Sequence, residues 1–227
     1  MSRKSQRNRP QQDLPSGPQA PAESNRALYI GAIVALLLAL LAGAALLKSK
    51  TPSDAPATDS ARPAALASEH SPALGDAAAR VHIVEFLDPA CETCAQFYPL
   101  LKQLLAENPG KLRVSLRHVA FHDGAEHAVR VLEASRNQDR YWQTLEALFA
   151  SQAQWAPHHT VQPELVDQAI AGVGLDLQRL AADMNSPEVT ARIERDRADA
   201  MALKVTATPE YFVNGRPLPS FGYDQLL

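Results

Sequence analysis

The sequence predicts an α/β domain in its second half, and three observations lead to that prediction. Residues 81–86 form a β-branched apolar run typical of a central strand, and apolar residues then recur at helical spacing until a stop signal at residues 108–110. Residues 112–119 alternate in polarity as a second strand would. Near the end, residues 211–213, an Asn-Gly turn and residues 216–218 have the pattern of a hairpin. A strand, a helix and a strand followed by a hairpin are typical of an α/β fold.

The N-terminal part has a different composition. Residues 1–26 are rich in Pro, Gln, Ser and Arg without apolar periodicity, which predicts a disordered cytoplasmic tail. Residues 27–47 are an uninterrupted apolar run without a charge, long enough as a helix to cross a hydrocarbon layer of roughly 30 Å. This run predicts one transmembrane helix. A cleaved signal peptide is the alternative, but its apolar region usually spans only about 7 to 15 residues.

Basic residues flank the apolar run unequally. Five precede it and two follow it closely, namely Arg3, Lys4, Arg7, Arg9 and Arg26, and then Lys48 and Lys50. The positive-inside rule therefore places the N-terminus in the cytoplasm and the rest of the chain outside. Residues 48–74 are dominated by Ala, Pro, Ser, Thr and Asp, which predicts a flexible linker.

The charge balance argues against one class of partner. The 227 residues contain 22 Lys and Arg against 25 Asp and Glu, so the chain lacks the broad basic surface that would neutralise many phosphates. Nucleic acid is therefore not an expected partner. The 2 cysteines are too few for a small fold stapled by disulfides, but they lie close together, at Cys91 and Cys94.

Residues 124–204 carry several helical patterns separated by turns. One helix is expected over residues 125–136 and another over residues 141–151. Ser186 and Pro187 are typical of a helix cap and a first-turn proline, and they predict a third helix that runs toward residue 203. Helices therefore dominate the middle of the domain.

The segment Cys91, Glu92, Thr93 and Cys94 lies where the first strand gives way to a helix. Unpaired backbone N–H groups and the helix dipole stabilise a thiolate at a helix N-terminus, so Cys91 is the expected nucleophile. Cys94 lies one turn further along the same helix face. It is expected to resolve the mixed disulfide that Cys91 forms with a partner.

Two other interpretations of the cysteine pair are possible. A purely structural disulfide would close a loop too short to stabilise the fold much. A metal site completed by His118 and His122 has a possible ligand count. However, His118 is expected in or just after a strand and His122 in the following loop, and the sequence contains no second cysteine pair. Redox chemistry is the favoured interpretation.

Several longer stretches resemble one family. Residues 75–76, 81–94 and 208–215 are similar to the DsbA-like branch of the thioredoxin superfamily. Further similar positions lie between them, namely Arg117, His118, the loop to Ala128, Tyr141, Trp142, Leu145, Leu148 and Phe149. The resemblance covers residues 75–227. It implies a thioredoxin fold, which is a central mixed sheet flanked by helices, with a helical insertion at about residues 124–204.

The resemblance also implies the other parts of an active site. Pro209 would be a cis-proline facing Cys91, and Thr208 would offer backbone groups to an extended substrate strand. Glu85 occupies the strand position where this superfamily commonly places a buried acid, and its carboxylate could relay the proton of Cys94. An exposed acid on an edge strand is the alternative for Glu85, although a single Glu in an apolar strand is costly unless it is paired or functional.

Three further features concern the details of this family pattern. Pro99 lies inside the expected active-site helix, and we expect it to bend the helix rather than end it. Glu92 departs from the strongly oxidising members, which tend to carry His between the cysteines. Its charge is expected to raise the Cys91 pKa and so to make a weaker oxidant. Residues 223–227 resemble the start of the family's last helix, so the sequence is expected to stop within that helix.

Two other groups of rings are conspicuous. Tyr141, Trp142 and Phe149 have the spacing of one helix side, and core packing is a better interpretation than a peptide-binding surface. His158 and His159 are adjacent on a polar loop, where side chains rarely converge on one ion. No role is assigned to them.

Together these features predict a membrane-tethered thiol-disulfide oxidoreductase that exchanges disulfides with cysteine-containing protein substrates, without a metal or an organic cofactor. The expected location is the bacterial inner membrane, crossed once, with the catalytic domain on the periplasmic side. Electrons would pass to or from an unidentified redox partner protein, and the oxidase, reductase and isomerase directions stay open. The alternative is a metal-holding or peptide-binding thioredoxin-like module without redox turnover.

Overall fold

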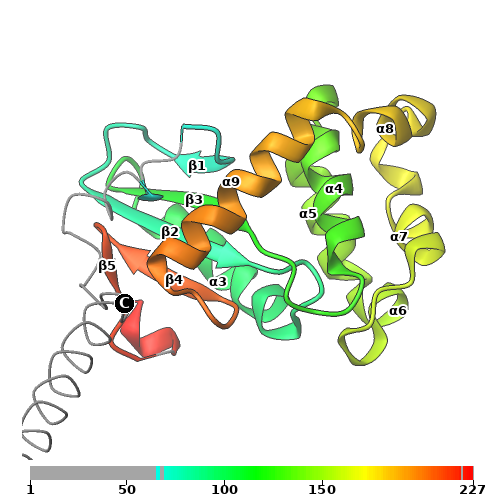
Figure 1. The fold of residues 1–227 in the computed structure, drawn as a ribbon. Coiled ribbons are helices and arrows are strands. Elements are labelled where there is room, and N and C mark those ends of the chain that lie inside the picture. Colours follow the sequence, from blue (N-terminus) through cyan, green and yellow to red (C-terminus); the bar gives the residue numbers. More distant parts are fainter. Residues whose placement is uncertain (1–64, 67–68, 221, 227) are drawn as a thin grey trace, which may run out of the picture. The chain divides into compact units, whose positions relative to one another are not determined.

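The computed structural model of the protein describes residues 65–66, 69–220 and 222–226 (Figure 1). The predicted tail and the predicted transmembrane helix lie outside the described residues, and so does most of the predicted linker. Among the described residues, no helix is both long enough and apolar enough to cross a membrane.

A five-stranded mixed sheet forms the centre of the domain, in the order β1-β3-β2-β4-β5. The central strands β2 and β3 are parallel, whereas β1 runs antiparallel to β3, β4 antiparallel to β2 and β5 antiparallel to β4. The strands are β1 (Ala73–Gly75), β2 (Val81–Leu87), β3 (Leu112–His118), β4 (Glu210–Val213) and β5 (Arg216–Pro217). The predicted α/β class is confirmed, with its strand-helix-strand start and its hairpin finish.

Alternation along β2 directs its side chains into two separate cores. Ile83 and Leu87 belong to the larger core, which includes buried residues of helix α3 (Glu92–Glu107) and of the insertion helices. Val84 and Phe86 belong to the smaller core, which includes Ala200 of helix α9 (Pro187–Leu203). Because successive side chains of a strand point to opposite faces, the side chain of Glu85 lies on the same face as the larger core.

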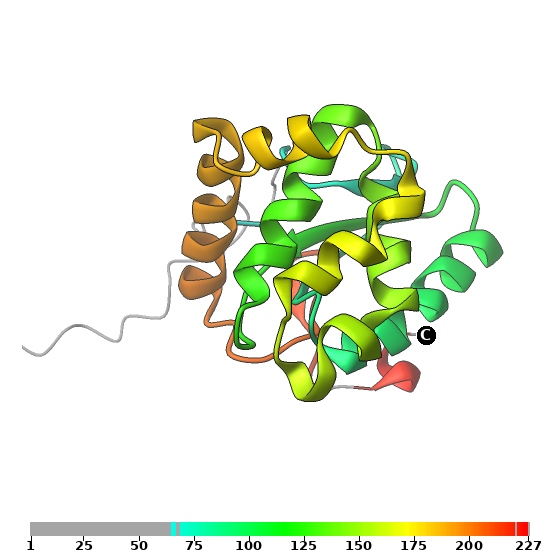
Figure 2. The same cartoon turned by 90° about the vertical axis from the view of Figure 1, so that its right-hand side faces the viewer.

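The chain between β3 and β4 forms the helical insertion that was predicted at about residues 124–204. Its helices are α4 (Ala125–Ser135), α5 (Tyr141–Ala150), α6 (Gln152–Trp155), α7 (Pro163–Ala169), α8 (Leu177–Asp183) and α9, and short 3-10 turns are η1 (Arg136–Gln138), η2 (Pro157–His159) and η3 (Ala171–Val173). A fourth 3-10 turn, η4 (Tyr223–Gln225), follows β5. Figure 2 shows helices α4 to α8 gathered between α9 on one side and α3 on the other.

Local signals in the sequence explain how two of the long helices begin and continue. The Ser186 hydroxyl accepts a hydrogen bond of 3.2 Å from the Val189 N–H, and Pro187 is the first residue of α9. This is the cap that the sequence predicts. Pro99 lies inside α3, which continues to Glu107, so the proline does not end the helix.

Strand β1 was not predicted from the sequence. Its three residues pair with β3 at positions 113–115, although residues 73 and 74 fall within the predicted linker. Gly75 has a φ of +88°, and a Cβ atom there would lie 2.1 Å from the Leu112 carbonyl oxygen. Only glycine fits this close approach. Three residues are too short a segment to show an alternating pattern, which is why periodicity did not reveal the strand.

A buried ion-pair network joins β3 to helices α4 and α9. The Arg117 guanidinium bonds to the Asp196 carboxylate, whose other oxygen accepts a hydrogen bond of 2.8 Å from the His118 N–H. The Nδ1 atom of His118 lies 3.0 Å from Glu133 Oε1, and Glu133 Oε2 lies 2.7 Å from Arg192 Nε. Charges buried in this way are stable only when each is paired, so the network fixes α4 and α9 against the sheet.

Candidate active site

Cys91 and Cys94 lie at the junction of β2 and α3. Cys91 is the N-cap residue of α3, with an extended backbone, and its N–H donates a hydrogen bond of 3.0 Å to the Asp88 carbonyl. Both side chains are free thiols. The relative exposure is 5% for Cys91 and 1% for Cys94, so Cys94 lies deeper. In this arrangement the outer thiol can react with a partner first, and the inner thiol can then attack the resulting mixed disulfide.

The two thiols have opposite acid-base properties. The pKa of Cys91 is lowered to about 5, chiefly by a hydrogen bond from the Cys94 thiol, while burial opposes the shift. The Thr208 side chain and the backbone N–H groups of Cys94 and Thr93 lower this pKa further. Burial raises the pKa of Cys94 well above its ordinary value, and the negative charges of Cys91 and Glu85 act in the same direction. The thiolate is therefore on Cys91 at neutral pH.

Thr208 and Pro209 lie against Cys91. The peptide bond between them is cis, as predicted. The Cys91 Sγ atom lies 3.3 Å from the Thr208 carbonyl oxygen, to which the thiol form can donate. Residues 208–209 come directly before β4, so an extended peptide beside them would lie next to the sulfur.

Glu85 lies on β2 and is 1% exposed. The Tyr211 hydroxyl on β4 donates a hydrogen bond of 3.1 Å to Glu85 Oε1, while Oε2 has no hydrogen-bond partner among the described residues. Burial raises the pKa of Glu85 to about 8, the Tyr211 bond opposes this shift, and the charge of Cys91 adds to it. The carboxyl group is therefore largely protonated at neutral pH and can both give and take a proton. The interpretation of Glu85 as an exposed edge-strand acid is wrong, because β2 is central and the side chain is buried.

Asp88 is a functional candidate that the sequence analysis missed. Its buried carboxylate accepts hydrogen bonds from the N–H groups of Ala90, Phe121 and His122, at 2.8, 2.7 and 2.9 Å. The His122 ring adds a contact of 2.8 Å from Nδ1. Asp88 thus ties the loop before Cys91 to the loop after β3. Its position three residues before the cysteine was visible in the sequence, but its partners were not.

Gln152 and His159 were also missed. The Gln152 amide nitrogen donates to the carbonyls of Pro89 and Cys91, at 2.7 and 3.0 Å. His159 Nδ1 lies 3.3 Å from the Ala90 carbonyl oxygen. The His159 ring also stacks on the ring of His122, with 4.7 Å between centroids. No local signal in the sequence marks either residue, because both reach residues 89–91 from 61 to 69 positions further along the chain.

The histidines of the alternative metal site do not join the cysteines. His118 Nε2 lies 2.8 Å from the Tyr141 hydroxyl, and its Nδ1 atom faces Glu133 in the ion-pair network. His122 is bound to Asp88 instead. Within the described part of the chain, the group with the spacing of metal ligands is His118, Glu133 and Asp196. Its carboxylates are already paired with arginines.

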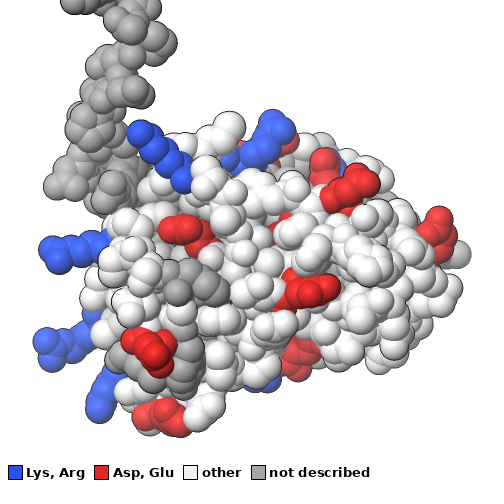
Figure 3. All heavy atoms as spheres, turned by 90° about the horizontal axis from the view of Figure 1, so that it is seen from below, with Lys and Arg blue, Asp and Glu red and all other residues white. Residues whose placement is uncertain are grey.

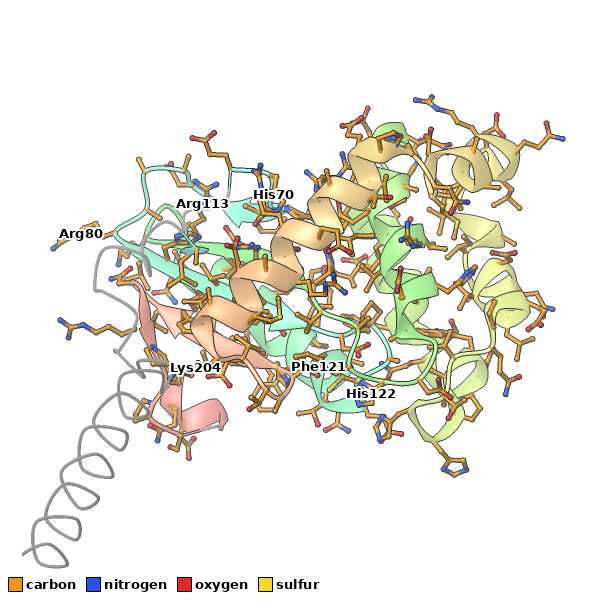
Figure 4. All side chains as sticks on the ribbon, in the orientation of Figure 1. His70, Arg80, Arg113, Phe121, His122 and Lys204 are labelled. Carbon is orange, nitrogen blue, oxygen red and sulfur yellow. The ribbon has the colours of Figure 1, made fainter. Side chains whose placement is uncertain are left out.

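Exposed apolar side chains lie on the surface beside the active site. Figure 4 shows Phe121 and His122 on the lower side of the domain, on the loop that Asp88 holds. Figure 3 views the domain from below, and few charged side chains appear over the centre of this face. Phe121 and Met201 are exposed, and they line one groove together with Val205 and the charged residues Glu126, Glu194 and Arg197.

Comparison with known proteins identifies the family. A family model described as thioredoxin matches residues 67–226. A solved thioredoxin-like oxidoreductase from Silicibacter pomeroyi DSS-3 has 28% sequence identity and a TM-score of 0.62, with 73% of this chain and 92% of that chain covered. The disulfide bond formation protein D of Bacillus subtilis is 25% identical over 163 residues, which cover 68% of this chain and 73% of that protein.

The chain is also similar to part of a much longer protein. It is 36% identical over 140 residues to the Na(+)/H(+) antiporter NhaA of Herminiimonas arsenicoxydans, which covers 62% of this chain. That match spans only 22% of the antiporter's own length.

Proposed function

Because this chain belongs to the thioredoxin family, in its DsbA-like branch of thiol-disulfide oxidoreductases, we propose that Cys91 and Cys94 exchange disulfides with cysteine-containing protein substrates. The observation that carries the proposal is that the pKa values of the two neighbouring thiols are shifted in opposite directions. Cys91 has a lowered pKa and borders the cis Thr208-Pro209 bond, while the buried Cys94 beside it keeps its proton.

The oxidised protein would donate its disulfide to a substrate through two successive thiol-disulfide exchange steps. A substrate thiolate attacks Cys91 in the oxidised protein, so that a substrate-Cys91 bond forms and the Cys91-Cys94 bond breaks. Cys94 leaves with the electron pair and takes a proton, which the protonated Glu85 is placed to supply. A second substrate thiolate then attacks the substrate sulfur, and Cys91 leaves as a thiolate. The substrate gains one disulfide, and the protein is reduced to the dithiol.

The reverse direction uses the same groups. The Cys91 thiolate attacks a substrate disulfide, and Cys94 resolves the mixed disulfide after giving its proton to the Glu85 carboxylate. The lowered Cys91 pKa favours donation, because a stabilised thiolate is a good leaving group and stabilises the reduced protein. Glu92 was expected to raise this pKa, but its side chain is exposed, and the Cys91 pKa is lowered, chiefly by the Cys94 thiol.

Two features support protein substrates. The Thr208 carbonyl lies beside Cys91, where an extended substrate segment could pair with it. The exposed apolar side chains of Phe121 and Met201, which line one groove, suit unfolded chains, because such chains expose apolar side chains of their own.

The proposal also includes an anchor and a location. The apolar run at residues 27–47, outside the described residues, supports a single membrane-spanning helix, and its basic flank supports a cytoplasmic N-terminus. The catalytic domain would then lie in the bacterial periplasm, tethered to the inner membrane. A second redox protein, still unidentified, would reoxidise or reduce the cysteine pair.

The test is a reduction potential measured in glutathione buffers, together with a trapping experiment in cells. We expect a reversible two-electron couple in the unchanged protein, and covalent substrate complexes with Cys94→Ser, because the mixed disulfide on Cys91 then cannot be resolved. Cys91→Ser should trap none. A missing couple, or stoichiometric metal that is lost in Cys91→Ser, would instead support the metal-holding alternative.

A further inference from the structure

Three successive carbonyls before and at the first cysteine are held by side chains of the helical insertion. Gln152 Nε2 donates to the Pro89 carbonyl at 2.7 Å and to the Cys91 carbonyl at 3.0 Å. His159 Nδ1 lies 3.3 Å from the carbonyl of Ala90, between them. Side chains of the insertion therefore hold the backbone of residues 89–91, which includes the reactive Cys91.

Gln152 is well fixed for this task. It is buried, and it is the first residue of α6. The last residue of α6, Trp155, donates from its indole N–H to the Leu148 carbonyl at 2.8 Å and accepts from the Gln162 N–H at 2.8 Å. An amide nitrogen has two N–H donors, and here each can meet one carbonyl. Among side chains of this length and shape, neither Met nor an ionised Glu could donate to either.

The hydrogen bond to the Cys91 carbonyl acts close to the sulfur. This carbonyl also accepts the hydrogen bond of 3.2 Å from the Ala95 N–H in the first turn of α3. In a planar trans peptide the N–H points opposite to the C=O. Gln152 thus helps to set the direction of the Glu92 N–H and of the first helical turn. Backbone N–H groups of this turn, those of Thr93 and Cys94, stabilise the Cys91 thiolate.

We propose that Gln152 is a positioning residue through which the helical insertion sets the reactivity of Cys91. The inference rests on the proposed disulfide exchange and adds a residue to it. Without the Gln152 amide, the buried Pro89 carbonyl loses this donor and the Cys91 carbonyl keeps only the Ala95 N–H, so the loop at residues 89–91 shifts. The N–H groups of Thr93 and Cys94 in the first turn of α3 are then less well aligned with the Cys91 sulfur. The thiolate, and with it the reduced protein, becomes less stable.

The experiment compares Gln152→Met with Gln154→Met in the full chain. Met keeps the length of the side chain but donates no hydrogen bond, and Gln154 is an exposed residue of the same helix. We expect Gln152→Met to lower the equilibrium constant for reduction of the protein disulfide by glutathione about tenfold, the size of one or two lost hydrogen bonds. The midpoint of Cys91 alkylation by iodoacetamide should move to higher pH. Gln154→Met should match the unchanged protein in both measurements.

A second variant separates positioning from packing. Gln152→Glu keeps the shape of the side chain but places a carboxylate against the two carbonyls. We expect it to shift both measurements in the same direction as Met, and further. If Gln152 only fills space, Gln152→Met, which keeps the length of the side chain and adds no charge, and the unchanged protein would agree within about twofold in both measurements, and that result would overturn the inference. A missing glutathione couple in the unchanged protein would overturn the proposed function, while the alkylation profiles would still decide the role of Gln152.

Discussion

Two buried carboxyl groups of this domain behave in opposite ways. Glu85 on β2 and Glu133 on α4 are each 1% exposed. Burial raises the Glu85 pKa to about 8, and the Tyr211 hydroxyl that bonds to it carries no charge to offset this. Burial acts on Glu133 as well, but His118, Arg136 and Arg192 lower its pKa to about 2. The sign of the shift is therefore decided by the partners of the carboxyl group and not by its burial.

The comparison separates a reactive region from a structural one. The region around Glu85 keeps a carboxyl group without a cation, which costs stability and provides a proton near neutral pH. The network around Glu133 and Asp196 neutralises each charge and holds helices against the sheet. In Figure 4, His70 of the network lies on the upper side, and His122 of the loop after β3, which bonds to Asp88 beside the active site, lies on the lower side.

The largest effect is expected from a substitution in the ion-pair network around Arg117, where one buried charge is removed. Asp196→Asn keeps the shape of the side chain but removes one of the two counter-charges of the buried Arg117 and leaves only the less buried Asp199. We expect the free energy of unfolding, measured with urea, to fall by about 3 to 5 kcal/mol. The matched control is Glu146→Gln, which breaks an exposed pair with Lys102 and should cost less than about 1 kcal/mol. Equal losses in the two variants would contradict the distinction.

The next effect tests the reactive region through pH. The folded-state pKa of Glu85, about 8, lies above its ordinary value of 4.5, so its contribution to stability is fully present below 4.5 and is lost as the pH rises through about 8. Glu85→Gln should remove this loss. The variant should therefore be more stable than the unchanged protein at pH 9, by a few kcal/mol in urea unfolding.

The same variant should be a poor catalyst, because an amide cannot transfer a proton. We expect the oxidation of a dithiol peptide at pH 7 to slow by roughly a hundredfold. Glu107→Gln, at the exposed far end of α3, serves as the control and should change neither measurement. A Glu85→Gln protein with unchanged rate and unchanged pH dependence would remove Glu85 from the mechanism.

The smallest expected effect concerns Glu92. Its side chain is exposed, so water and salt screen its charge from the Cys91 sulfur. We expect Glu92→Gln to lower the Cys91 pKa by less than about half a unit, as measured by thiolate absorbance. A shift of more than one unit would restore the importance that the sequence analysis gave to this residue.

Periodicity and end signals predicted most of the elements. The β-branched run at residues 81–86, the cap at Ser186 and the Asn-Gly turn each act locally, so each is visible in a few neighbouring residues. The cysteine pair and the buried position of Glu85 could also be predicted, because a charged residue in an apolar strand is conspicuous. Strand β1 could not, since its three residues are fixed by pairing with β3.

The parts of the site that sequence reasoning missed act through the backbone of other segments. Asp88 accepts from the N–H groups of residues 121 and 122, and Gln152 donates to the carbonyls of residues 89 and 91. Any residue type presents the same N–H or C=O group. The sequence at the receiving end therefore carries no sign of the contact, and only the folded arrangement reveals it.

The buried arginine network also binds the segment that precedes β1. Arg117 donates from Nη1 to the Ala65 carbonyl at 2.7 Å, and His70 Nε2 lies 2.7 Å from Asp196 Oδ1. Leu66 is buried in the smaller core. A fragment beginning at Gly75 would lack all three of these contacts, two of which involve Asp196 of α9 or its partner Arg117. Residues 65–70 therefore belong to the packed domain, and protease cleavage between Leu66 and Gly75 should loosen α9, a helix far from the cut in sequence.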